Sequence, residues 1–163
     1  MAEDEPPRRL PSDVEAILRR LLQKRESILK FLLSDIDEKG NFGKRWLIIT
    51  NCRLITVNSE TGNTYSIPLE LVRSAETIDY VGNGELKVTT PLGSEKVIRF
   101  SRKYVEDFRK AANLLNAIAK KKVLLSGGHL RSEVYWCERR KIAKSRILRW
   151  LMSFLKPSWG YLL

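Results

Sequence analysis

The sequence predicts an α+β fold in which about seven short antiparallel strands lie between two amphipathic helices. Apolar residues recur at helical spacing near the start of the chain, between Val14 and Leu22. Short runs rich in branched residues follow, and glycine and asparagine separate them roughly every ten residues. A second set of apolar residues at helical spacing, between Tyr104 and Ile118, ends this region. This order of elements predicts one folded body over residues 12–122.

The first helix is expected over residues 13–24, after a flexible tail at 1–11. Its apolar face consists of Val14, Ile17, Leu18, Leu21 and Leu22. The sequence SDVE at 12–15 has the spacing of a capping box, in which Ser12 and Glu15 each accept a hydrogen bond from a free backbone N–H.

The strands are expected where apolar and branched residues alternate with turn residues. Their predicted ranges are 27–34, 45–50, 53–57, 65–68, 72–80, 85–90 and 96–100. Within 85–90, Leu86, Val88 and Thr90 alternate with polar residues, which is typical of a half-buried strand. Glu85 and Glu95 could face each other across a hairpin, and we expect both carboxylates to be solvated.

The second helix is expected to begin with Ser101 as its cap and to end at Lys120–Lys122, where lysines favour the helix dipole. A linker at 123–131 follows because Gly127 and Gly128 interrupt the pattern. A last helix is predicted over 132–156 and ends before Pro157. It is amphipathic, with basic residues on one side and apolar residues on the other.

The formal net charge is +11, and it is unevenly distributed. Residues 1–40 carry 8 basic and 9 acidic side chains, whereas residues 123–163 carry 8 basic and 2 acidic ones. Basic clusters of this kind attract the phosphates of nucleic acids or of lipid head groups. No run of apolar residues reaches the roughly 18 needed to span a bilayer.

The letters LSGG at 125–128 resemble the start of the signature motif of ABC-type ATPases. That motif acts with a phosphate-binding loop, G-x-x-x-x-G-K-[ST]. The Gly-Lys pair of this chain is Gly43-Lys44, with Arg45 after it and Glu38 at the position of the first glycine. The sequence therefore predicts that LSGG is part of the linker and binds no nucleotide.

The residues that usually carry chemistry are sparse. His129 is the single histidine, and Cys52 and Cys137 have no C-x-x-C partner. We therefore expect no catalytic residues, no metal site and no cofactor, and we do not expect this chain to be an enzyme.

The segment from Gly40 to Val72 resembles bacterial pleckstrin-homology-like (PH-like) domains, whose pattern is G-x-F-G-x-R-x-L-x-x-T-x-x-R-L followed by I-P-L. The matching residues are Phe42, Gly43, Arg45, Leu47, Thr50, Arg53, Leu54, Ile67, Pro68 and Leu69. The resemblance covers about residues 26–121. It implies a PH-like partial barrel of about seven antiparallel strands capped by a C-terminal helix.

The end of the chain, Arg146 to Leu163, is similar to the entry of the membrane domain of ABC exporters. There a short amphipathic elbow helix lies on the cytoplasmic face, and a phrase like L-x-x-L-K-P-[YH]-x-x-x-L-L leads into the first membrane helix. The matching residues are Leu151, Phe154, Leu155, Lys156, Pro157, Leu162 and Leu163. This resemblance implies a non-catalytic accessory region at the cytoplasmic face of the cell membrane, in a longer parent protein that binds ATP and transports a substrate. The chain stops where the apolar span would begin.

Basic and aromatic side chains in the last segment are the predicted membrane contacts, because both kinds concentrate at the head-group level. They are Arg139, Arg140, Lys144, Arg146, Arg149, Trp150, Phe154, Leu155, Lys156 and Trp159. Around a strand turn, Lys39, Lys44 and Arg45 could bind a phosphate head group, although a solvated turn is the simpler interpretation.

Other functions stay open at this point. The chain could be a free-standing PH-like adaptor bound to the inner leaflet, and the last segment could pair with a transporter's membrane domain or with a second copy in a homodimer. Nucleic-acid binding is disfavoured, because the sequence predicts neither a reading helix nor the exposed aromatic pattern of single-strand binders.

Overall fold

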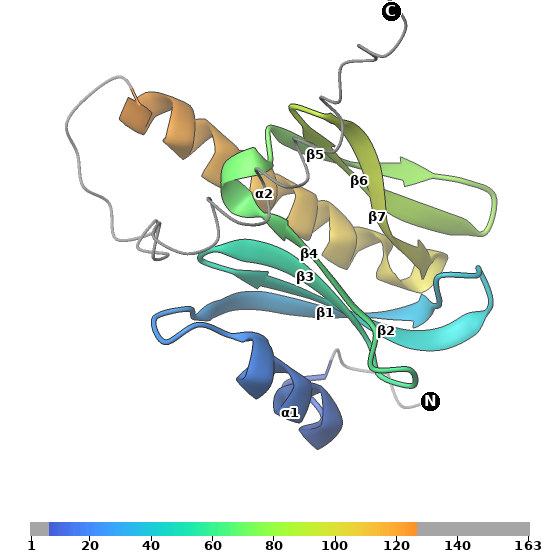
Figure 1. The fold of residues 1–163 in the computed structure, drawn as a ribbon. Helices are drawn as coiled ribbons and strands as arrows, with labels where there is room; N and C mark the ends of the chain where they lie inside the picture. The colour runs from blue at the N-terminus through green and yellow to red at the C-terminus, as the bar shows by residue number, and fades with distance from the viewer. Residues whose placement is uncertain (1–6, 127–163) are drawn as a thin grey trace, which may run out of the picture.

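The computed structural model describes residues 7–126, with the backbone alone at 122–126, and contains two helices and seven strands in that range (Figure 1). The elements are α1 (Ser12–Leu21), β1 (Ile28–Ile36), β2 (Phe42–Thr50), β3 (Arg53–Asn58), β4 (Thr64–Pro68), β5 (Ser74–Asp79), β6 (Asn83–Thr90), β7 (Gly93–Ser101) and α2 (Val105–Ser126). Two short 3-10 turns, Leu69–Leu71 and Arg102–Tyr104, precede β5 and α2. The predicted α+β class is confirmed, and so is each of the seven strands.

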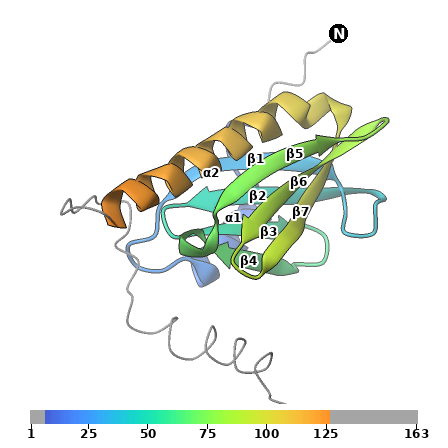
Figure 2. The ribbon, with the colours of Figure 1, turned by 90° about the horizontal axis from the view of Figure 1, so that it is seen from above.

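The strands form two antiparallel sheets. Sheet A has the order β1-β2-β3-β4, and sheet B has the order β5-β6-β7. The sheets meet where β1 approaches β7, since the Ser101 N–H donates to Asp35 Oδ1 at 3.0 Å. Helix α2 covers the open interior from one end (Figure 2). This architecture is compatible with the PH-like partial barrel.

The main core lies between the two sheets and α2. Side chains from every layer take part, including Leu47 and Leu54 of sheet A, Leu86 of sheet B and Leu115 of α2, all buried. The ring of Phe100 stacks on that of Phe108, with centroids 4.2 Å apart. Gly84 allows this packing, because a Cβ at Gly84 would lie 2.6 Å from the Phe100 ring.

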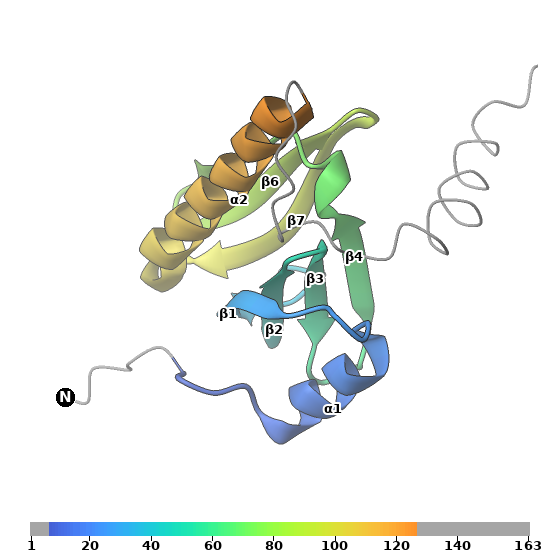
Figure 3. The same ribbon diagram turned by 90° about the vertical axis from the view of Figure 1, so that its left-hand side faces the viewer.

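A second core lies on the outer face of sheet A, under α1 (Figure 3). Val14 and Leu18 of the helix are buried against Trp46, Ile48 and Ile55 of the sheet, as the periodicity of residues 14–22 predicts. Each such aliphatic side chain contributes about 1.5–3 kcal/mol when fully buried. The predicted N-terminal helix is therefore an integral layer of the body.

A buried ion pair fastens the end of α1 to sheet A. Arg53 donates two hydrogen bonds to Glu26, from Nε to Oε1 at 2.9 Å and from Nη2 to Oε2 at 3.1 Å. Nη2 also donates to the carbonyl of Leu21. Thr50 Oγ1 donates to Glu26 Oε1 at 2.6 Å, and it accepts the N–H groups of Cys52 and Arg53 in the β2–β3 turn. Two residues of the T-x-x-R sequence thus hold the turn and the helix together.

Three local expectations were wrong. Ser12 lies inside α1 rather than at its cap, the cap position is Pro11, and no side-chain hydrogen bond caps the helix. The helix ends at Leu21 because Leu22 is extended, with ψ 138°, and Arg53 takes the Leu21 carbonyl. Ser101 likewise makes no cap hydrogen bond; it precedes the 3-10 turn that leads into α2.

The expectation for Glu85 was also wrong. Glu85 lies opposite Arg99, while Glu95 lies opposite Val88, so the two carboxylates do not face each other. The Glu85 side chain is buried, accepts a hydrogen bond from the Tyr80 hydroxyl at 2.8 Å and lies 3.3 Å from Lys96 Nζ. The alternation of residues along the strand predicts that Glu85 is exposed to solvent, but neighbouring aromatic and basic side chains cover it.

The predicted last helix, with its basic character, lies outside the described residues. Most of the predicted linker at 123–131 also lies outside them, but residues 123–126 belong to α2, which continues to Ser126. Among residues 7–126, no helix is long and apolar enough to cross a membrane.

We predict that Arg53→Met lowers the free energy of unfolding by about 3 kcal/mol, because it leaves the buried Glu26 carboxylate without its charged partner. Urea denaturation of the purified chain measures this change. The neighbouring Arg25→Met serves as the matched control and should stay within about 0.5 kcal/mol of the wild type, since its side chain is exposed. Equal effects of both substitutions would contradict the role of the ion pair.

The same pair predicts a pH dependence. Burial alone would raise the pKa of Glu26. The carboxylate also accepts hydrogen bonds from Arg53, Thr50 and the Gln23 N–H, and it lies beside the charge of Arg53. Together these interactions outweigh burial and lower the pKa below the ordinary 4.5. A lowered carboxyl pKa stabilises the fold above the unfolded-state pKa, and this stabilisation is lost as pH falls through the folded-state value. The stability difference between wild type and Glu26→Gln should be constant near neutral pH and shrink below about pH 4.5, as measured by urea denaturation across pH.

Candidate functional site: a polar pocket between the sheets

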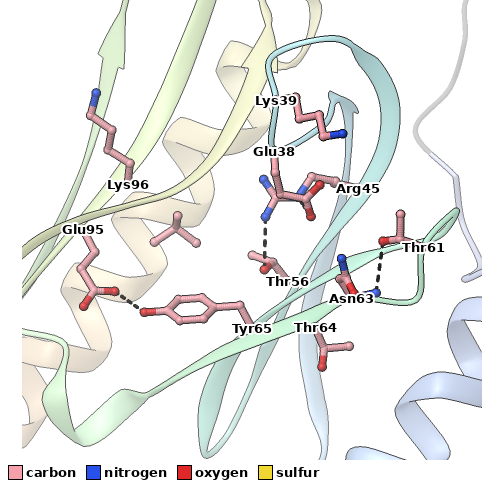
Figure 4. A pocket seen from close by; sticks show the side chains of 11 residues that line it. Glu38, Lys39, Arg45, Thr56, Thr61, Asn63, Thr64, Tyr65, Glu95 and Lys96 are labelled. Atoms are coloured by element: carbon pink, nitrogen blue, oxygen red, sulfur yellow. Dashed lines mark hydrogen bonds and ion pairs between the residues drawn. The ribbon is translucent and has the colours of Figure 1, made fainter. Parts of the chain in front are cut away.

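A pocket of about 880 Å³ opens between sheet A and the first half of β7 (Figure 4). Its size lies within the range of small-molecule sites. Polar side chains from the β1–β2 turn, β2, β3, β4 and β7 dominate its wall. The lining residues are Glu38, Lys39, Arg45, Thr56, Thr61, Asn63, Thr64, Tyr65, Glu95, Lys96 and Val97.

The β1–β2 turn positions one rim of the pocket. Asp37 Oδ1 accepts the N–H groups of Lys39 at 2.9 Å and of Asn41 at 2.8 Å, and Gly40 supplies a positive φ of 87°. This turn directs the Glu38 carboxylate toward β2 and β3, where it accepts a hydrogen bond from Asn58 Nδ2 at 2.9 Å. Lys39 is exposed.

Arg45 is the buried cation of the pocket, with its side chain 9% exposed. Nη2 donates to Thr56 Oγ1 at 3.4 Å. Nε lies 3.3 Å from Glu38 Oε1, close enough for an ion pair, but the geometry gives it no hydrogen bond within the described part of the chain. Burial lowers the pKa of Arg45, and the nearby charges of Glu38 and Asp37 partly counter this effect. Nε is itself buried, so this unused donor is not open to solvent.

Tyr65 and Glu95 connect the two sheets across the pocket. The Tyr65 hydroxyl donates to Glu95 Oε2, which joins β4 to β7 (Figure 4). Burial, this hydrogen bond and the charge of Glu95 raise the pKa of Tyr65 to about 12. The phenol consequently stays protonated at neutral pH and acts as a donor to the carboxylate.

The lining combines charged side chains of both signs with neutral hydrogen-bonding groups. Lys39, Arg45 and Lys96 supply positive charge, Glu38 and Glu95 supply negative charge, and three threonines and Asn63 supply neutral hydrogen-bonding groups. The lining includes no cysteine and no histidine. Within residues 7–126, no cluster of three or more histidine, cysteine, aspartate or glutamate side chains is placed to hold a metal ion.

The structure separates the three head-group candidates of the β1–β2 region. Lys39 lies at the rim of the pocket, Arg45 lies in its wall, and Lys44 is exposed and does not line it. The alternation of side chains along β2 explains why adjacent residues point to opposite faces. The ten predicted contacts from Arg139 to Trp159 lie outside the described residues.

Sequence reasoning missed Tyr65, Glu95 and Lys96 as site residues. Tyr65 and Glu95 are 30 positions apart and come from different sheets, so local patterns carried no signal of their contact. The signal that was available was an aromatic residue in an otherwise hydroxyl-rich edge strand, Thr64–Pro68.

No protein-family model and no curated protein matches the chain. The solved structures similar to it include a DUF1696 family protein with a pleckstrin-homology domain from Shewanella loihica PV-4, at 15% sequence identity and a TM-score of 0.49, covering 66% of this chain and 99% of that one. The C-terminal domain of an unknown protein from Leishmania infantum is similar at 14% identity and a TM-score of 0.44, covering 69% of this chain and 92% of that one. Likeness at this level carries no argument about function.

We predict that Glu95→Gln lowers the pKa of Tyr65 from about 12 toward its ordinary value of 10.0, because burial of the phenol persists but the carboxylate charge that accepts its hydrogen bond is removed. Absorbance at the phenolate band, recorded across alkaline pH, measures the change. Tyr65→Phe assigns the signal, since it deletes this one phenol from the titration. An unchanged titration in Glu95→Gln would show that the two side chains are not coupled in solution.

Proposed function

We propose that this chain is a non-catalytic PH-like accessory module that residues 132–163 hold at the cytoplasmic face of a membrane, and that its pocket binds an acidic group of a partner. The pocket is the observation that supports a binding role most directly. It combines a nearly buried arginine, whose Nε has no hydrogen-bond acceptor among the described residues, with lysines and hydroxyls around it.

The membrane context is supported by sequence. Residues 127–163 carry eight basic and two acidic side chains together with Trp136, Trp150 and Trp159. Basic side chains contribute about 1 kcal/mol each near an anionic surface, and interfacial tryptophans add apolar contact. The similarity of Arg146–Leu163 to an exporter elbow supports the more specific proposal that the parent protein is an ABC-exporter-type transporter. The reading frame after Leu163 tests this proposal, since an apolar span of about 20 residues is required there.

Vesicle flotation tests the membrane attachment. We expect residues 1–163 to float with anionic vesicles and residues 1–126 to float much less, because the latter lacks the basic and aromatic tail. Charge reversal at Arg146 and Arg149 should weaken binding to anionic vesicles and reduce its salt dependence. Trp150→Ala with Phe154→Ala should weaken binding to neutral vesicles as well.

The alternatives give different results in the same assay. A failure of the full chain to float at low salt would refute membrane attachment and favour a protein partner or homodimer for the tail. A circular dichroism melt of each protein confirms that differences do not arise from unfolding.

The pocket is tested with inorganic pyrophosphate as a soluble acidic probe. We expect pyrophosphate to change amide chemical shifts only in the β1–β2 turn, β4 and β7. Arg45→Met should lower the affinity for pyrophosphate at least about tenfold, because it removes a charge-assisted donor. Lys44→Met is the matched control, since Lys44 lies next to Arg45 but outside the pocket. Equal loss of binding in both variants would indicate a diffuse electrostatic effect rather than a site.

A further inference from the structure

Five charged side chains line the pocket, and their ion pairs show which of the charges already have a partner. Arg45 Nε lies 3.3 Å from Glu38 Oε1, so these two compensate each other. Lys96 Nζ lies 3.3 Å from Oε1 of Glu85, a buried carboxylate of β6 that does not line the pocket. Three of the five charges are therefore compensated within the protein.

The other two charged side chains of the lining are Lys39 and Glu95. Neither forms an ion pair within the described part of the chain. Lys39 belongs to the β1–β2 turn and Glu95 to β7, and they lie on opposite sides of the pocket (Figure 4). The pocket therefore has an uncompensated positive charge on one side and an uncompensated negative charge on the other.

The Glu95 side of the pocket has room for a further hydrogen-bond donor. The Tyr65 hydroxyl donates to Glu95 Oε2, whereas Glu95 Oε1 accepts no hydrogen bond from any described side chain. The Glu95 side chain is half-buried, and Tyr65 beside it is 49% exposed. A cationic donor at Oε1 would form a charge-assisted hydrogen bond and would lie close to an aromatic ring, which also attracts cations.

An organic ammonium suits this position better than a metal ion. Hard metal ions take several oxygen ligands, often more than one of them a carboxylate. The second carboxylate of the lining, Glu38, is paired with Arg45 and accepts a hydrogen bond from Asn58. The phenol of Tyr65 stays protonated at neutral pH because its pKa is raised to about 12. Glu95 is thus a single carboxylate, which matches the several N–H donors of a primary ammonium.

We propose that the pocket binds a small zwitterion, with a primary ammonium at Glu95 and Tyr65 and a phosphate or carboxylate at Lys39. This inference rests on the binding role proposed above for the pocket, and it adds the cationic end of the ligand. An anion alone would compensate Lys39 but would bring a second negative charge toward Glu95, whereas a zwitterion compensates both side chains. A lipid head group and a soluble metabolite can both supply this chemistry.

The test uses the full chain and O-phosphoethanolamine, with its N-acetyl derivative as the matched ligand that lacks the ammonium. Amide chemical shifts at one fixed ionic strength measure both affinities. We expect O-phosphoethanolamine to bind at least about fivefold more tightly than the N-acetyl derivative. Glu95→Gln should weaken O-phosphoethanolamine binding at least about tenfold, since it removes a charge-assisted hydrogen bond, and should leave pyrophosphate binding unchanged or stronger.

Two further variants control for charge and for the anionic end. Glu70→Gln changes the net charge as Glu95→Gln does, but Glu70 is exposed and lies outside the pocket, so both affinities should stay within about twofold. Lys39→Met should weaken O-phosphoethanolamine and pyrophosphate alike, because both present phosphate to this side chain. Glutamine at position 95 keeps the size of the side chain, and a thermal melt confirms that each variant is folded.

Vesicles distinguish the two sources of the zwitterion. Binding of wild type and Glu95→Gln is compared on phosphatidylcholine vesicles with and without phosphatidylethanolamine. A gain from phosphatidylethanolamine that Glu95→Gln abolishes supports the inference with a lipid head group as the ligand. Glu95-dependent binding of the soluble probe without such a gain supports it with a soluble zwitterion as the ligand.

The remaining outcomes separate this inference from the proposed function. If pyrophosphate binds at the pocket but O-phosphoethanolamine binds no more tightly than its N-acetyl derivative, the zwitterion inference is wrong while the site for an acidic group stands. The same conclusion follows if Glu95→Gln and Glu70→Gln have equal effects. If none of the three ligands shifts the amides of the pocket, the proposed binding role fails and the inference fails with it.

Discussion

Sheet A is apolar on both faces, and most of the architecture follows from this constraint. In β2 and β3, Leu47 and Leu54 point to the interior, while Trp46, Ile48 and Ile55 point to the outside, and all five are buried. An antiparallel sheet of a small domain usually leaves one face to water. Here each face needs its own cover, so sheet B and α2 close the interior and α1 closes the outside. The short connection between α1 and β1 is then held in place by the buried pair of Arg53 and Glu26.

The same constraint decides where a polar site can form. Apolar side chains fill the middle of the barrel, so polar groups gather where the sheets diverge, between β4 and the first half of β7. Arg45 stands at the boundary: its position on β2 points inward, yet its guanidinium reaches Thr56 and Glu38 at the rim. Burying a guanidinium is costly unless it is paired, and one carboxylate and one hydroxyl do not use all of its donors. One of these donors, Nε, is buried at the wall of the pocket and has no hydrogen-bond acceptor among the described residues.

Charge follows the architecture as well. Arg45 of β2 is paired with Glu38, and Arg109 of α2 is paired with Asp79 and Glu106, whereas Lys39 and Lys44 are exposed and form no ion pair within the described part of the chain. In the 22–27 connection, Glu26 is buried under Arg53, so the neighbouring Lys24 and Arg25 are exposed and form no ion pair with any described residue.

The sequence by itself determined the class of the fold and the identity of its elements. Alternation and turn residues located all seven strands to within about three residues at each end, and helical periodicity located the buried face of α1, because these signals are local. It also singled out Arg45, Thr50 and Arg53 as part of a recurring pattern. Their roles were decided only by the tertiary structure. Arg53 ends α1 at Leu21 through a contact 32 residues away, and Tyr65 meets Glu95 across two sheets. Glu85 is buried by Tyr80 and Lys96 although its strand pattern reads as solvated. Such contacts depend on how distant segments pack, and no local propensity encodes that packing.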